Sequence, residues 1–339
     1  MTPKERIYAT IAGKDVDRPA VTPIFMAWAA HYVGHTYRDY YLDSAVLAKA
    51  QLAVTRDFNI DQISAISDPF RETSAYGVEF DWPEEGVGKA KELLINSPAD
   101  ISRVAPIDIE NSARTRDRLE GVKKLAAEVA QTHSVLGWVE GPVAEYGDLR
   151  GVENTLMDLI DRPDMFAEAC RIIVENAINF ARAQIAAGAD MIGVGDAAAS
   201  LISPDMYVEH VLGWEKKLID GIHDAGATVK LHICGDITNT IEHMADTGAE
   251  VIDIDWMVPP DEARAAVGDD ITLCGNFDPS GVLFQGTPQT VAEAARKCLA
   301  LGGKKFILMP GCEVPPGTPP ENLKAFCPGA NCLVEQLQG

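Results

Sequence analysis

Short apolar, β-branched runs alternate with longer amphipathic stretches along most of the chain. Short runs of this kind are typical of buried strands, and the longer stretches predict helices that cover a parallel sheet. The predicted strands are Ala20–Phe25, Ile60–Ala65, Ser134–Glu140, Met191–Gly195, Thr228–Ile233, Val251–Asp255, Ile271–Gly275 and Phe306–Met309. The clearest predicted helices are Asp164–Ala187, Pro204–Ala225, Ile237–Thr247 and Thr290–Leu301.

The residues that flank these helices support the assignment. Ser203 and Thr287 are predicted N-caps, each followed by a proline suited to the first helical turn. Gly188, Gly226 and Gly248 each end a helix and precede the next strand. Eight such units predict an α/β protein with a (β/α)8 TIM barrel, as one domain over residues 1–339.

Composition narrows the range of partners. The 339 residues include 51 acidic and 29 basic side chains, for a net charge of −22. Such a surface repels phosphate backbones and anionic lipid, so neither nucleic acid nor a membrane is expected as a partner. The charged start Met1–Arg6 leads into no long apolar run, which predicts a cytoplasmic protein without a secretory signal.

Cysteine and histidine positions indicate candidate chemistry. Seven cysteines in an apparently cytoplasmic chain argue against a disulfide framework. His232 and Cys234 are two residues apart at the end of a predicted strand, so their side chains share the face toward the barrel mouth. Imidazole and thiolate together suit zinc, although a buried thiol beside a hydrogen-bonded histidine has the same pattern.

A third soft ligand follows the last predicted strand. Cys312 lies in a loop rich in proline and glycine, between Met309 and Pro320. The upper loops of a barrel all face the central mouth, so Cys312 could join His232 and Cys234. Three protein ligands with one open position are the pattern of catalytic zinc. Cys274, without a partner motif, is interpreted as a buried small apolar residue.

These motifs, in this order, resemble the zinc methyltransferases of the uroporphyrinogen decarboxylase superfamily. The resemblance covers most of the chain and includes Gly141-Pro142, Gly195-Asp196, Ser203-Pro204, Ile252–Trp256, Gly275–Pro279 and Thr318–Leu323. It implies a (β/α)8 barrel in which His232, Cys234 and Cys312 hold Zn²⁺. It also implies transfer of a methyl group between a corrinoid (methylcobalamin) supplied by a partner protein and a small methyl donor or acceptor.

The chain departs from the family's decarboxylases in one segment. Those enzymes carry an early Arg-Gln-Ala-Gly-Arg segment whose arginines bind the substrate's propionates, whereas Pro23–Tyr32 here contains no arginine. A porphyrinogen with eight carboxylates needs such cations. The departure argues against uroporphyrinogen decarboxylation and favours a smaller or more apolar ligand, packed by Met26, Trp28 and Tyr146.

Several roles stay open at this stage. Asp255 could be a fourth, displaceable zinc ligand, or it could cap a loop or hydrogen-bond His232. Asp196 and Asn276, predicted catalytic residues, could orient substrate or cap loops. A tetrapyrrole decarboxylase and a zinc-stabilised binding protein without turnover remain the alternative functions, and the direction of methyl transfer is open.

Overall fold

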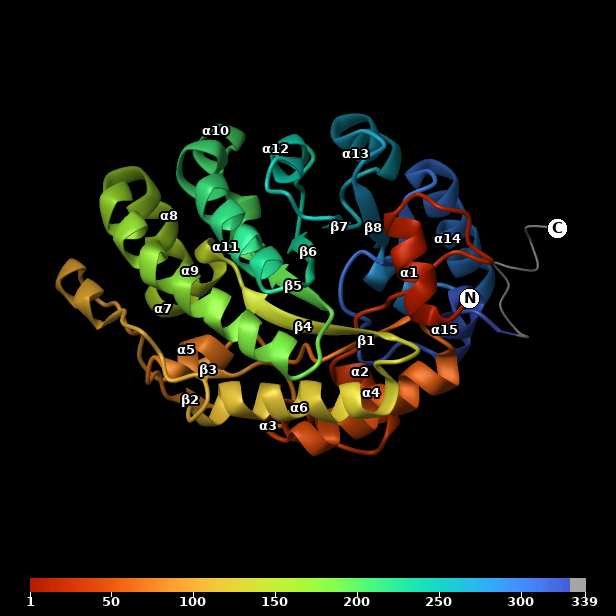
Figure 1. The fold of residues 1–339 in the computed structure, drawn as a ribbon, viewed down its shortest axis with the longest axis horizontal. Coiled ribbons are helices and arrows are strands. Elements are labelled where there is room, and N and C mark those ends of the chain that lie inside the picture. Colours follow the sequence, from red (N-terminus) through yellow and green to blue (C-terminus); the bar gives the residue numbers. More distant parts are fainter. Residues whose placement is uncertain (330–339) are drawn as a thin grey trace.

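A computed structural model describes residues 1–329 of the chain. Seven parallel strands form one curled sheet in the order β1-β4-β5-β6-β7-β8-β9, and two short antiparallel strands form a separate ribbon (Figure 1). The sheet comprises β1 (Gln62–Ser64), β4 (Ser134–Glu140), β5 (Met191–Gly195), β6 (Thr228–Ile233), β7 (Val251–Ile254), β8 (Thr272–Phe277) and β9 (Phe306–Pro310). The ribbon comprises β2 (Phe80–Asp81) and β3 (Lys89–Ala90).

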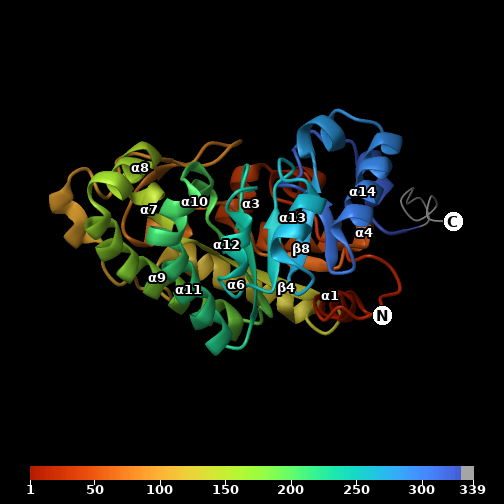
Figure 2. The ribbon, with the colours of Figure 1, turned by 90° about the horizontal axis from the view of Figure 1, so that it is seen from above.

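Helices surround the outer face of the curled sheet, and α8 and α14 lie on opposite sides of the molecule (Figures 1 and 2). The α-helices are α1 (Pro3–Ile11), α2 (Ala27–Tyr32), α3 (Tyr37–Leu42), α4 (Ser44–Phe58), α5 (Arg71–Ala75), α6 (Ala113–Val129), α7 (Pro142–Arg150), α8 (Val152–Asp161), α9 (Pro163–Ala186), α10 (Pro204–Met206), α11 (Leu212–Asp224), α12 (Ile241–Ala245), α13 (Pro260–Val267), α14 (Pro288–Gly302) and α15 (Pro320–Phe326). Two 3₁₀ segments, η1 (Pro98–Arg103) and η2 (Ala197–Leu201), and two π segments, η3 (Tyr207–Val211) and η4 (Pro279–Phe284), complete the set.

Seven of the eight predicted strands are present, and the predicted strand Ala20–Phe25 is the exception. Its only strand-like pairing is a parallel bridge between Val21 and Leu308. The backbone still bonds on both sides, because Leu308 N–H donates to the Ala20 carbonyl and Asp61 N–H donates to the Val21 carbonyl. Pro23 has no N–H and so cannot continue a ladder, which explains why this segment is not a regular strand.

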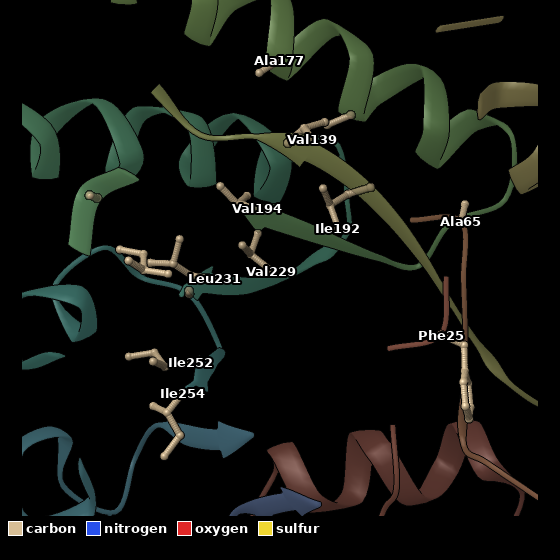
Figure 3. Close-up of a cluster of buried hydrophobic side chains, with 14 of the residues drawn as sticks. Phe25, Ala65, Val139, Ala177, Ile192, Val194, Val229, Leu231, Ile252 and Ile254 are labelled. Carbon is tan, nitrogen blue, oxygen red and sulfur yellow. The ribbon is translucent and has the colours of Figure 1, made fainter. Parts of the chain in front are cut away.

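Side-chain alternation divides the sheet into two apolar layers. Val139, Val194, Leu231 and Ile254 point outward into a large cluster beneath the helices, drawn in Figure 3. The inward-pointing residues form a second cluster, which includes Leu136, Trp138, Met191, Cys274 and Met309. This inner layer fills the space enclosed by the curled sheet, and Cys274 is buried there as the sequence predicts.

Helix ends follow the sequence signals closely. The Ser203 and Thr287 side chains accept hydrogen bonds from Met206 N–H and Thr290 N–H, which confirms both predicted N-caps. The predicted helix over residues 204–225 is present, although η3 interrupts it with a π turn. Over residues 237–247 only Ile241–Ala245 is α-helical. Within residues 1–329, no helix combines the length and the apolar character that crossing a membrane would require.

A buried cluster of charged side chains holds the Ala20–Phe25 segment against the residue that precedes β1. The Asp61 carboxylate is fully buried, pairs with Arg6 and Arg18, and accepts a 2.8 Å hydrogen bond from Val21 N–H. Both arginine side chains are largely buried; Arg18 pairs with this carboxylate, and Arg6 pairs with it and with Asp17. Removal of one member of such a cluster leaves buried charge without compensation.

We therefore expect Asp61→Asn to lower the free energy of unfolding by about 3–5 kcal/mol. The matched control is Asp15→Asn, since Asp15 is 96% exposed and pairs only with Lys304 at the surface; its effect should be small beside that of Asp61→Asn. Urea unfolding followed by circular dichroism measures both. Equal stability of the two variants would contradict the role assigned to Asp61.

Candidate metal centre

The end of β6 positions two of the candidate ligands. His232 lies on the inner face of the strand, and Cys234 is the first residue after the strand. Cys312, in the loop after β9, completes a cluster whose ligand atoms all lie within 4.8 Å of one another. His232 Nε2 is 2.8 Å from Cys234 Sγ, and Cys234 Sγ is 4.0 Å from Cys312 Sγ. The structure thus brings together the three residues that the sequence singled out.

Close backbone packing fixes the distance between the loop that carries Cys234 and the loop that carries Cys312. Asp255 Oδ2 accepts a 2.9 Å hydrogen bond from Gly235 N–H, directly after Cys234. A side chain at Gly311 would meet the backbone nitrogen of Trp256 at 2.3 Å, so only glycine allows the Cys312 loop to approach so closely. Asp255 and its neighbour Trp256 therefore lie between the two cysteine loops and fix their separation.

An ion pair beneath the cluster orients His232. The Asp253 carboxylate is fully buried on the inner face of β7, 3.5 Å from His232 Nδ1 and 2.9 Å from Lys230 Nζ. The Asp253 backbone carbonyl also lies 3.2 Å from Nδ1. Acceptors on this side favour a proton on Nδ1, which leaves Nε2 to face the two sulfurs as a metal ligand.

Charges within the cluster shift the thiol and imidazole pKa values. The hydrogen bond from Cys234 lowers the pKa of Cys312 to about 4, and the same contact raises the pKa of Cys234. Burial works to lower the pKa of His232, but the charges of Cys234 and Asp253 raise it well above its ordinary value. A cation bound among these three side chains would displace the protons that they share.

The donor set fits zinc. Two thiolates at ~2.3 Å from a tetrahedral zinc ion lie ~3.8 Å apart, close to the 4.0 Å separation of Cys234 Sγ and Cys312 Sγ. One imidazole nitrogen and two sulfurs are the borderline-soft donors that this ion prefers. Among residues 1–329 no fourth histidine, cysteine or carboxylate belongs to the cluster.

The cluster lies at the wall of a cavity of about 180 Å³. Its wall is mainly apolar or aromatic and also carries three carboxyl groups. The apolar and aromatic residues are Ile24, Met26, Tyr37, Ile66, Pro69, Val87 and Trp138. The carboxyl groups belong to Asp68, Glu140 and Glu313. The Trp138 ring covers Gly193 on β5, where any side chain would meet the ring at 2.2 Å.

Of the three residues expected to pack a ligand, Met26 alone is among those that line this cavity. Trp28 is buried under the loop after Cys312, where its Nε1 donates a 2.8 Å hydrogen bond to the Thr318 carbonyl. Tyr146 is buried in α7 and donates a 3.0 Å hydrogen bond to Asp158. A ligand-packing role for Trp28 or Tyr146 is not supported by their positions, because both are enclosed by the protein itself.

The expected catalytic residues also point away from the cavity. Asp196 is buried, its Oδ1 accepts a 2.6 Å hydrogen bond from Ala144 N–H at the start of α7, and burial together with Glu215 raises its pKa well above the usual range. Asn276 donates to the Asp255 and Val258 carbonyls. Asp255 accepts hydrogen bonds from Gly235 N–H and Met257 N–H. All three tie loops together, the capping role that the sequence left open.

Two further residues line the cavity at positions that strand alternation indicates. Trp138 and Glu140 share the inner face of β4 with Leu136, and Glu140 ends the strand as His232 nearly ends β6. The rule that the carboxyl ends of barrel strands carry site residues would have selected Glu140. Asp68 and Glu313 lie in irregular segments, where no periodicity indicates direction.

Comparisons with known proteins place the chain in a family. The uroporphyrinogen decarboxylase (URO-D) family model matches residues 2–330, so the chain belongs to this family. It is 28% identical, over 96% of both chains, to the methylcobamide:CoM methyltransferase MtaA of Methanosarcina barkeri. It is also 28% identical to the uroporphyrinogen decarboxylase of Prochlorococcus marinus, over 80% of this chain and 78% of that one. A solved methyltransferase from Methanosarcina mazei, 24% identical, has the same fold, with a TM-score of 0.86 over 100% of both chains.

The cluster predicts about one zinc ion per chain and a large loss of zinc in Cys312→Ala, because water must replace a thiolate. The matched control is Cys274→Ala, a buried cysteine on the same inner face that lies outside the cluster. Zinc content after dialysis against a weak chelator measures both variants. Retention of full zinc by Cys312→Ala would rule out the proposed ligand set.

The Asp253 carboxylate predicts a smaller effect on the same measurement. Asp253→Asn should weaken zinc binding about 10–100-fold, the usual effect of losing the carboxylate that orients a histidine ligand. Asp196→Asn is the control, since Asp196 is also a buried carboxyl group but bonds to α7 instead. Competition with a chromophoric chelator gives both affinities, and identical values would show that Asp253 does not orient His232.

Proposed function

We propose that this protein is a zinc-dependent methyltransferase that moves a methyl group between a corrinoid carried by a partner protein and a small thiol or methylated molecule. The observation that carries the proposal is a cluster of three soft ligands, open on one side, at the wall of an apolar cavity. Three protein ligands with one exchangeable position are the arrangement of catalytic zinc, whereas structural zinc has four protein ligands.

His232, Cys234 and Cys312 would hold the metal. When bound there, zinc would lower the pKa of a coordinated thiol or stabilise a departing thiolate or alkoxide. Asp253 orients the His232 ring, and Asp255 sets the spacing of the cysteine loops without entering the ligand set. The apolar wall near Met26 and Trp138 excludes water from the sulfur or oxygen of the bound molecule.

The related proteins support methyl transfer over the alternatives. MtaA of Methanosarcina barkeri, matched over nearly the whole chain, is named for methyl transfer from a methylcobamide to CoM. Decarboxylases belong to the same family, but the residues that line the cavity include no arginine or lysine to bind propionates. A binding protein with closed zinc would need a fourth protein ligand, and the cluster among residues 1–329 contains three.

The same proposal includes the finer features of the fold. We take Ala20–Phe25 as the eighth position of a closed barrel, because its backbone bonds to Leu308 of β9 and to Asp61 beside β1. We take residues 1–339 as one domain, in keeping with a single family match over residues 2–330. Cys234 and Cys312 must stay reduced to bind a metal. This requirement supports a cytoplasmic location, where thiols are kept reduced.

The test of the proposal is methyl transfer with methylcobalamin as donor and a panel of small thiols as acceptors, together with the reverse reaction from methyl ethers and thioethers. The zinc-loaded protein should turn over at least one pair, and Cys312→Ala should lose at least about 100-fold in kcat/KM, because the metal is lost. Cys274→Ala should keep its activity. No transfer in either direction by zinc-loaded protein would refute the proposal.

Uroporphyrinogen is expected not to react. The cavity lacks cationic side chains for its carboxylates, so carbon dioxide release and coproporphyrinogen formation should stay at the level of a no-enzyme control. Turnover comparable with that of a genuine decarboxylase, measured in the same assay, would show that the family alternative is the correct one.

A further inference from the structure

Apart from the metal ligand His232 and the two cysteines, the ionisable side chains that line the cavity are carboxyl groups and one tyrosine. Three carboxyl groups line it, from Asp68, Glu140 and Glu313, and the lining residues include no lysine or arginine. Apart from the metal ligands, the rest of the wall is apolar or aromatic, with Met26, Ile66 and Trp138 among its members. A small molecule bound through its sulfur or oxygen at the metal must place the remainder of its body against this wall.

Three buried guanidinium groups lie behind this wall: Arg118 donates to the Trp138 carbonyl, and the other two are paired with carboxylates. Arg71 and Arg114 both form ion pairs with Asp68, at 3.6 Å for Arg71. Arg71 also pairs with Asp117 at 2.9 Å, and Arg114 donates to the Tyr41 carbonyl. These two cations are therefore balanced by two carboxylates of the protein itself. An anionic ligand could recruit them only by displacing Asp68.

The Glu140 carboxyl group also makes the cavity wall a poor partner for a charged ligand. Its Oε1 accepts a 3.0 Å hydrogen bond from Trp138 Nε1, and its backbone N–H donates to Glu72. Burial, together with the nearby charge of Glu72, raises the pKa of Glu140 well above its ordinary value. Burial and Glu72 therefore oppose ionisation of Glu140, so this carboxyl group is a poor partner for a cation, and in its protonated form it can donate a hydrogen bond to a ligand oxygen.

Anionic groups are the poorest match for such a wall. A sulfonate or carboxylate in the cavity would lose hydration without gaining a cationic partner, and it would lie close to further carboxyl groups. An uncharged hydroxyl, ether or alkyl body loses little hydration and fits the apolar side chains. Electrostatic repulsion and the loss of hydration thus both weaken the binding of an anionic ligand relative to an uncharged one.

We propose that the small-molecule partner of the metal site is an uncharged thiol or its methylated form, and that the cavity discriminates against anionic thiols such as coenzyme M. This inference rests on the proposed function, since it assumes that sulfur binds at the metal. It separates this chain from its relative MtaA, whose name specifies CoM as the methyl acceptor.

The test is calorimetric titration of the zinc-loaded protein with two-carbon thiols that differ only in the end group. These are 2-sulfanylethanol, ethanethiol, 2-sulfanylethanesulfonate (coenzyme M) and 2-aminoethanethiol. We expect the two uncharged thiols to bind at least about tenfold more tightly than coenzyme M, a difference of ~1.4 kcal/mol. The cationic thiol should also bind more weakly than 2-sulfanylethanol.

Each outcome bears on one of the two proposals. Coenzyme M affinity equal to or above that of 2-sulfanylethanol would overturn this inference and leave the zinc methyltransferase intact. Tightest binding of 2-aminoethanethiol would also overturn it, because the carboxyl groups would then act as anions toward the ligand. If one zinc is bound and none of the four thiols binds, this inference fails, and the methyl-transfer assay alone decides the proposed function.

A variant pair tests whether wall charge is the cause. Met26 is half-buried at the cavity wall, so Met26→Lys adds a cation and Met26→Leu keeps the wall apolar. The preference for 2-sulfanylethanol over coenzyme M should shrink about tenfold or more in Met26→Lys and persist in Met26→Leu. Zinc content and the unfolding curve verify that both variants are folded. An unchanged preference in Met26→Lys would contradict the electrostatic explanation.

Discussion

Side chains on the inner face of the curled sheet are enclosed by inner side chains of other strands and by residues such as Ile7 of α1, and most of the site follows from this constraint. Deep in the interior, Leu136, Met191 and Met309 satisfy it by apolar packing. Lys230 and Asp253 are the exception, a buried ion pair on neighbouring strands. A pair of this kind is costly to bury unless it performs another task, and here its carboxylate also faces the Nδ1 atom of His232.

The same constraint explains which parts of the fold the sequence could predict. Strands such as Thr228–Ile233 are visible as short apolar runs, and the glycines that end helices mark where each begins. The Ala20–Phe25 segment has the same apolar pattern, but Pro23 has no N–H to donate and the Asp61 side chain accepts the Val21 N–H that a ladder would use. Hydropathy does not distinguish a strand from an extended segment held by side chains.

The three candidate ligands were predictable because strand ends converge and their chemistry is distinctive. The finer assignments were less predictable, since alternation gives the face of a residue but not what fills the space in front of it. Asp196 and Asn276 end strands as expected, yet both bond to loops and helix starts. Glu140, which does reach the cavity, belongs to no motif, and only its place at the carboxyl end of β4 indicates it.

The central claim is that a metal held by His232, Cys234 and Cys312 keeps one position for a small molecule. Zinc-edge X-ray absorption of the loaded protein, with and without saturating 2-sulfanylethanol, tests it most directly. We predict one nitrogen, two sulfurs and one light atom around zinc at rest, and a third sulfur at ~2.3 Å when the thiol is added. A first shell of four protein ligands that does not change with any thiol would contradict the account.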